Sequence, residues 1–245
     1  MLNSIVADNE EEIMAYKVLS IWGGAWLAVH SLTGCSVHPS QEFLSIDKLT
    51  PGIFMEAEER AILPPGVEVR KVYDKGLQLT KDSEGFVDRL YDDAARFCTI
   101  AYGHLVKKAP CDGSEPVRYL DGITEPEGTM LLRDDMEIAE RAVMTLVDVE
   151  LTDGQYAALS DFVFNVGSGN FGESTLLRMV NSGRHDQVPF QMRRWVKAGG
   201  RELPGLKTRR EGEIELYFEG LAIPRAVPEA GLDLSPIDIL TGETL

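Results

Sequence analysis

Basic residues are scarce in this 245-residue chain, where 24 Lys and Arg stand against 40 Asp and Glu and give a formal net charge of −16. Such an acidic surface does not neutralise phosphates, so the composition excludes a general nucleic-acid binder. Cysteine is also scarce, with only Cys35, Cys98 and Cys111. Three scattered thiols cannot build a disulfide framework or a zinc cluster, although Cys98 and Cys111 could pair in an oxidising compartment.

Several common catalytic signatures are missing. The chain has no GxxxxGKS/T, HExxH or GxSxG pattern, and these patterns mark nucleotide sites, zinc proteases and serine hydrolases. These three classes of protein therefore lack support in the sequence.

The charge is unevenly spread along the chain. Between Arg178 and Arg210, nine basic residues outnumber two acidic ones, Asp186 and Glu202. This local excess indicates either a surface for an anionic partner or an ordinary solvated helical face.

The remaining patterns are those of a mainly helical protein with a short strand segment. Apolar periodicity predicts a helix over 69–90, strands within 91–106 and a helix over 129–149. Thr152, with Gln155 three residues later, has capping-box spacing and opens a helix that is apolar on nearly every face. Gly167 to Asn170 would end it.

Shorter helices are expected towards the C-terminus. Ser174 or Thr175 would cap a helix that stops at 181–183, and Gly199-Gly200 would break a helix containing 190–196. A last helix is predicted over 209–221. The acidic, proline-containing tail after Pro224 is expected to have little structure.

Two carboxyl groups and a hydroxyl are the chemically suggestive residues. Glu84 stands near the end of the first predicted helix, Asp93 follows just before the strand segment, and Thr99 lies inside it. Two carboxyl groups across a cleft are the minimum equipment for glycosidic cleavage: one protonates the leaving oxygen and the other activates water. In so acidic a chain, this spacing alone is weak support.

The residues around these three sharpen the interpretation. The stretches EGF from Glu84, LYDD ending at Asp93 and TIAYGH from Thr99 closely resemble the signature of the phage-type lysozymes, glycoside hydrolase family 24. Further matches follow in the family's order over about residues 76–220, in the stretches LTDGQYAAL, FNVGSG, STLL and GLKTRR.

The resemblance implies a lysozyme-like α+β fold. The fold would be mainly helical, with two lobes, a small β-hairpin sheet in the N-terminal lobe and a cleft between the lobes. Residues 1–75 would be an N-terminal extension, 76–222 the lysozyme domain and 223–245 an acidic tail. The implied reaction is hydrolysis of the β-1,4 bond between N-acetylmuramic acid and N-acetylglucosamine in peptidoglycan, by a phage-encoded enzyme acting at the bacterial cell wall or in the periplasm. The enzyme class that the resemblance implies needs no metal and no organic cofactor.

The resemblance also implies roles for individual residues. Glu84 would be the general acid, and Asp93 with Thr99 would orient and activate the water. Because the family is regarded as inverting, we expect the two carboxyl groups to lie roughly 6.5–9.5 Å apart, with room for that water. The other matched positions are substrate contacts at Leu105, Phe164, Ser174 and Thr175, and structural residues near the site at His104 and Tyr102.

Some matched residues keep two interpretations. Trp195 is either a sugar-stacking platform or a core residue, and Arg209 and Arg210 either pair within the last helices or face the glycan. Ala101 stands where the family usually has glycine; its methyl group is either harmless or narrows the cleft.

The resemblance leaves residues 1–75 open. The uncharged run 18–37 is close to the roughly 20 residues of a membrane span but is rich in glycine. It could be a lipoprotein signal ending at Cys35, a releasable signal anchor like those of some phage endolysins, or part of a segment that docks on a phage particle or another protein.

Two rival activities also stay open: a lytic transglycosylase, which needs no water-activating Asp93, and a peptidoglycan-binding protein without activity.

Overall fold

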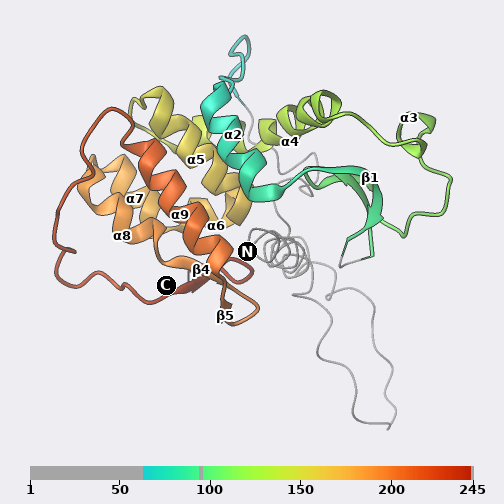
Figure 1. The fold of residues 1–245 in the computed structure, drawn as a ribbon. Coiled ribbons are helices and arrows are strands. Elements are labelled where there is room, and N and C mark those ends of the chain that lie inside the picture. Colours follow the sequence, from blue (N-terminus) through green and yellow to red (C-terminus); the bar gives the residue numbers. More distant parts are fainter. Residues whose placement is uncertain (1–62, 94–95, 244–245) are drawn as a thin grey trace, which may run out of the picture.

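The computed structural model describes residues 63–93 and 96–243 as a body of helices with a three-stranded sheet set to one side (Figure 1). This confirms the mainly helical α+β fold with its small sheet near the N-terminal side of the domain. The helices are α2 (Asp74–Glu84), α3 (Val117–Leu120), α4 (Glu125–Leu146), α5 (Asp153–Val166), α6 (Ser168–Glu173), α7 (Thr175–Asn181), α8 (Val188–Met192) and α9 (Pro204–Tyr217). The strands are β1 (Val87–Asp92), β2 (Cys98–Ala101), β3 (His104–Lys107), β4 (Trp195–Ala198), β5 (Arg201–Glu202) and β6 (Ile237–Asp238).

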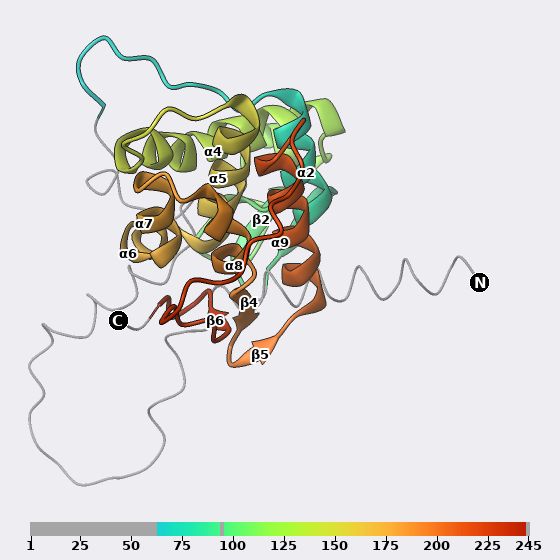
Figure 2. The ribbon, with the colours of Figure 1, turned by 90° about the vertical axis from the view of Figure 1, so that its left-hand side faces the viewer.

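Helix α5 forms the centre of the helical body. Thr152 caps it as expected, because its side chain accepts a hydrogen bond from the Gln155 amide while the Gln155 side chain accepts one from the Thr152 amide. From Tyr156 to Val166 every residue is buried, because α2, α4 and α9 pack around the helix (Figure 2). The all-round apolar pattern is thereby confirmed.

The prediction of one helix over 69–90 is wrong. Helix α2 ends at Glu84, where Gly85 takes a φ of 69° that other residues rarely adopt. The chain then enters β1, which pairs antiparallel with β2 through Tyr91 and Thr99. The strand segment expected over 91–106 supplies β2 and β3, which pair in turn.

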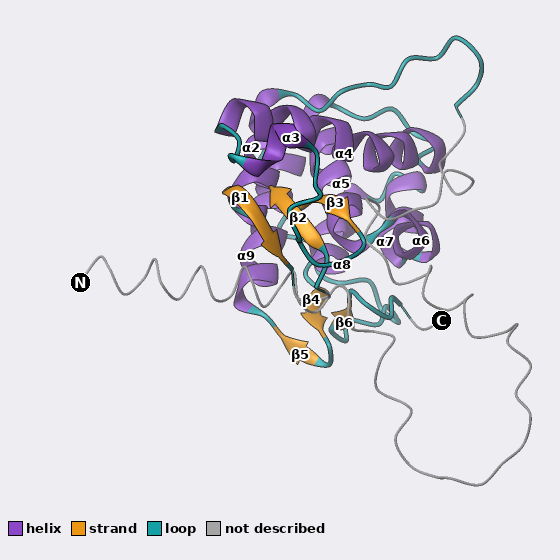
Figure 3. Ribbon diagram, turned by 90° about the vertical axis from the view of Figure 1, so that its right-hand side faces the viewer, coloured by secondary structure: helices purple, strands orange, loops and turns teal. Residues whose placement is uncertain are grey.

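The helix expected through 190–196 is also wrong in its second half. Helix α8 ends at Met192, and Trp195 begins β4 in a second sheet of order β5-β4-β6 (Figure 3). The Gly199-Gly200 pair, predicted as a helix breaker, is instead the turn between β4 and β5.

The last part of the C-terminal tail is structured, contrary to expectation, whereas residues 222–236 form no helix or strand. Strand β6 pairs parallel with β4, and Ile237, Ile239 and Leu240 join the hydrophobic core. Farther on, the Glu243 carboxylate lies 2.5 Å from Arg194 Nη1 and accepts hydrogen bonds from the amide and hydroxyl of Thr175. Paired backbone and buried side chains hold a segment that its composition alone would leave loose.

The uncharged run 18–37 lies outside the described residues. Among the residues that the structure does describe, no helix is long and apolar enough to cross a membrane.

Candidate active site

Glu84 is the last residue of α2, at the point where the helical body passes into the sheet. The residue is 9% exposed. Its Oε1 atom lies 2.7 Å from Nη1 of Arg209, which comes from α9. A carboxyl group predicted to act as an acid is therefore held by a buried cation.

Asp93 and Thr99 are joined through one backbone residue, Phe97. The Phe97 amide donates to Asp93 Oδ1 at 2.8 Å, and the Thr99 hydroxyl donates to the Phe97 carbonyl at 3.1 Å. Asp93 and Thr99 are both buried in the hairpin between β1 and β2. The Phe97 amide therefore holds the Asp93 carboxylate in one orientation.

Arg209 connects Glu84 to the core of the helical body. Its Nε and Nη2 atoms each donate at 2.9 Å to a different oxygen of Asp161, on α5, so the pair is bidentate. Burial alone would raise the pKa of Asp161, but the Arg209 charge and the hydrogen bonds outweigh burial and lower it.

A second ion pair lies behind the first. Arg210 Nη2 donates to Asn165 Oδ1 at 2.7 Å and lies 2.7 Å from Glu213, and its guanidinium stacks 4.7 Å from the Phe162 ring. Burial, together with the nearby Asp161 carboxylate, raises the pKa of Glu213 well above its usual value. Pairing within the last helix, one of the two interpretations, holds for Arg210 with Glu213. Arg209 instead pairs with α2 and α5, through Glu84 and Asp161.

Asp161 is the site residue that the sequence analysis missed. Its signal was present, because it stands in the middle of a helix predicted to be apolar all round. A carboxylate in such a place needs a cationic partner, and the arginine pair at 209–210 supplies one.

His104 and Tyr102 tie the sheet to α4. The His104 Nδ1 atom lies 3.0 Å from the Asp135 carboxylate, and the Tyr102 hydroxyl donates to Glu125 at 2.9 Å. Burial raises the pKa of Tyr102. These contacts fit the structural role that the resemblance implies, which stays a prediction.

The four expected substrate contacts have different surroundings. Leu105 is half-buried and pairs with Thr99 across β2 and β3, so it lies beside the expected catalytic strand. Phe164 is buried in α5, Ser174 is fully buried as the cap of α7, and Thr175 holds Glu243. Their contact with sugar stays a prediction.

Trp195 belongs to the core. It is 1% exposed, and its ring stands edge-on to that of Phe162 with the centroids 5.5 Å apart.

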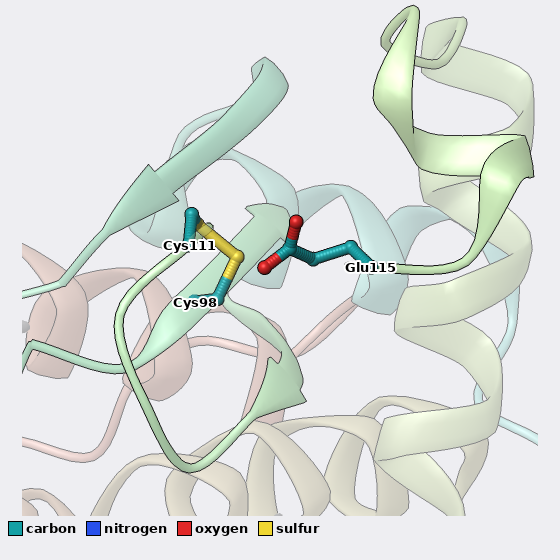
Figure 4. Close-up of side chains that lie close together, drawn as sticks. All are labelled: Cys98, Cys111 and Glu115. Carbon is teal, nitrogen blue, oxygen red and sulfur yellow. A yellow bond between two sulfur atoms is a disulfide. The ribbon is translucent and has the colours of Figure 1, made fainter. Parts of the chain in front are cut away.

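Cys98 and Cys111 form a disulfide next to Thr99 (Figure 4). Glu115 lies beside the sulfur atoms and accepts hydrogen bonds from the amides of Asp112 and Gly113. Because the two sulfur atoms are bonded to one another, they cannot serve together as thiolate ligands for a metal.

The basic residues between 178 and 210 do not form one positive surface. Three of them are buried in ion pairs, and three more pair with exposed or half-exposed carboxylates. The buried ones are Arg194, Arg209 and Arg210, and the paired ones are Arg184, Arg193 and Lys207.

Comparison with known proteins gives one consistent picture. The family described as "Phage lysozyme" matches residues 81–213. A SAR-endolysin of Bacteriophage PS119 is 37% identical over 137 residues, which cover 56% of this chain and 77% of the relative. An endolysin of Bacillus phage B103 is 35% identical over 147 residues, 59% of this chain and 53% of that protein.

Solved structures agree with the sequence relatives. The muramidase domain of SpmX from Asticcacaulis excentricus is 30% identical with a TM-score of 0.53, over 60% of this chain and 97% of that one. A mutant of P22 lysozyme gives the same identity and TM-score over 60% and 98% of the two chains. The chain therefore belongs to the phage lysozyme family and is a peptidoglycan glycosidase.

Proposed function

We propose that Glu84 and Asp93 are the acid and the base with which this lysozyme hydrolyses the β-1,4 bond between N-acetylmuramic acid and N-acetylglucosamine. The observation that carries this proposal is the hairpin turn in which one backbone residue, Phe97, binds both Asp93 and Thr99. Because both side chains bind the backbone of the same residue, the turn supports a role for Asp93 and Thr99 as a water-positioning pair.

In the proposed reaction, Glu84 delivers its proton to the glycosidic oxygen as the bond breaks. Asp93 takes a proton from a water held with the help of Thr99, and that water attacks the sugar carbon from the opposite face. The anomeric configuration would be inverted, which requires a separation of roughly 6.5–9.5 Å between the two carboxyl groups. A lytic transglycosylase would need neither Asp93 nor Thr99.

The first test removes the acid and keeps its shape. We expect Glu84→Gln to lower the rate of peptidoglycan cleavage by about 10²–10⁴-fold, the usual contribution of a general acid, with an unchanged circular dichroism spectrum. Asp82→Asn removes an exposed carboxylate from the same helix and should keep the wild-type rate. Cleavage by Glu84→Gln at the rate of Asp82→Asn would refute the assignment.

We further propose that residues 18–37 act as a releasable signal anchor that keeps the enzyme at the membrane before it reaches the cell wall. The support is the uncharged run itself and the relatives named SAR-endolysin. Cell fractionation after expression should find the intact chain first in the membrane and later in the periplasm. A chain shortened at Cys35 would indicate a lipoprotein, and an intact chain in phage particles would indicate a docking segment.

For the domain bounds, we propose a folding unit that is wider than residues 76–222. The contacts of Val72 with Glu140 and of Glu243 with Arg194 support a folding unit that extends a few residues before 76 and includes the tail. Limited proteolysis that leaves a fragment reaching from about residue 70 to the C-terminal residues would support the wider unit.

A further inference from the structure

The buried charges behind Glu84 come from three helices. Glu84 ends α2, Asp161 lies on α5, and Arg209, Arg210 and Glu213 lie on α9. Asp161, Arg210 and Glu213 have no exposed surface. Burial raises the pKa of Glu213 well above its usual value. Asp161 accepts two hydrogen bonds from Arg209, whereas Glu213 lies 3.7 Å from Arg209 Nε, so Asp161 is the carboxylate that chiefly opposes the Arg209 charge.

Arg209 alone would work against the acid role of Glu84. The guanidinium places a positive charge 2.7 Å from the carboxyl group that must deliver a proton to the leaving oxygen. The fork of two hydrogen bonds between Arg209 and Asp161 places a full negative charge against that guanidinium. Solvent screens buried charges little, so the negative charge of Asp161 reduces the positive potential that Arg209 exerts on Glu84.

The two hydrogen bonds from Arg209 to Asp161 also fix the direction of the third guanidinium nitrogen, Nη1. Arg209 uses Nε and Nη2 for Asp161, which leaves Nη1 as the donor to Glu84. The guanidinium is planar, so fixing two of its nitrogens fixes the third.

We propose that Asp161 is a positioning residue for the acid: it aims the Arg209 guanidinium at Glu84 and offsets its charge, so that Glu84 is held in place without an uncompensated positive charge beside it. This inference rests on the proposed role of Glu84. It assigns to α5, far along the chain from the catalytic hairpin, control over the pH range in which the enzyme works.

The test is the pH dependence of kcat/KM on soluble peptidoglycan oligomers. Asp161→Asn removes the negative charge that opposes Arg209. The alkaline limb of the profile, where kcat/KM falls as pH rises, should therefore move to lower pH by at least one unit. Arg209→Gln removes the cation, so the limb should move to higher pH. The double variant removes one charge of each sign and should fall between the two. A residue that only supports the fold would lower activity without shifts of opposite sign.

A second variant covers the case in which Asp161→Asn fails to fold. Arg209→Lys keeps the charge but lacks the fork, so kcat should fall at least tenfold while the limb stays within half a unit of wild type. A wild-type kcat in Arg209→Lys, or limbs that move the same way in Asp161→Asn and Arg209→Gln, would overturn the inference. Rapid cleavage by Glu84→Gln would instead overturn the proposed function, so the two failures are distinguishable.

Discussion

Ala101 has a backbone conformation that suits glycine better than alanine. Its φ is 60°, and the residue is fully buried at the end of β2. Its methyl group faces Gly128 of α4, where an added Cβ would lie 3.1 Å away. The methyl group of Ala101 therefore fits because Gly128 has no side chain. The left-handed backbone of Ala101 costs about 1 kcal/mol of strain.

We expect Ala101→Gly to stabilise the protein by up to about 1 kcal/mol, because relief of the left-handed conformation exceeds the entropy that glycine adds to the unfolded chain. Urea denaturation followed by circular dichroism measures the change. Ala142→Gly, in the interior of α4, is the matched control and should destabilise by about 1 kcal/mol. Destabilisation of similar size in both variants would show that the φ of Ala101 carries no strain.

The residues most readily identified from the sequence are those whose partners lie nearby in the chain. Glu84, Asp93 and Thr99 came from contiguous motifs, and the hairpin turn now explains why Asp93 and Thr99 go together. The Asp161–Arg209 pair joins residues 48 positions apart. Spacing along the chain carries no information about such a pair, although a carboxylate in an apolar helix indicates that a partner exists.

Among the elements, the loop between β3 and α3 is held by the most local set of contacts. The disulfide joins Cys111 to β2, and the buried Glu115 side chain bonds Lys107 at 2.8 Å. The Lys107 hydrogen bond and the amides of the loop lower the pKa of Glu115 to about 2. Because Cys98 precedes Thr99 directly, this loop supports the strand that carries the water-positioning hydroxyl.

The lowered pKa of Glu115 gives a pH-dependent contribution to stability. The pKa of a glutamate in the unfolded chain is about 4.3. The contribution of Glu115 to stability is therefore complete above that pH and is lost as pH falls through about 2. The difference in unfolding free energy between wild type and Glu115→Gln should therefore shrink from pH 5 to pH 2. Denaturant titrations at each pH measure it. Glu150→Gln, at an exposed position, serves as control, and its difference from wild type in unfolding free energy should not change with pH. A difference for Glu115→Gln that also stays constant with pH would contradict the lowered pKa of Glu115.

Elements with local signals were predicted well, and those that depend on tertiary pairing were not. Thr152 and Ser174 cap α5 and α7 as their spacing indicates, because capping needs only neighbouring residues. Strand β4 carries bulky residues that suit a helix equally well, and it becomes a strand because β5 and β6 lie on either side of it. The helical pattern over 69–90 failed at Gly85 for a related reason, since β1 exists only through its pairing with β2.

At the scale of the whole molecule, the end of the C-terminal tail packs against the helical body, where β6 pairs with β4 and apolar residues enter the core. Its last described residue, Glu243, forms a buried pair with Arg194, so the tail contributes to the core as well as covering it. This pairing compensates one of the nine basic residues between 178 and 210. Within the described residues, Arg194, Arg209 and Arg210 are buried in pairs with carboxylates of the same chain.

We expect Glu243→Ala to lower the free energy of unfolding by about 3 kcal/mol, because it leaves the buried Arg194 charge poorly compensated. The estimate lies at the low end for such pairs, since Asp233 remains 3.4 Å from Arg194. Glu229→Ala removes a carboxylate from the exposed pair with Arg184 and should cost no more than about 1 kcal/mol. Equal costs in urea denaturation would mean that the tail contributes no more than a surface ion pair.

The reaction itself is tested most directly by mass spectrometry of the muropeptides released from purified peptidoglycan by the whole protein. The roles of Glu84 as acid and of Asp93 with Thr99 as water-positioning groups predict products with reducing N-acetylmuramic acid ends, each carrying one added water. Digestion in ¹⁸O-labelled water should place the label on those ends. Anhydro ends without label would contradict the account, because they would show internal attack in place of hydrolysis.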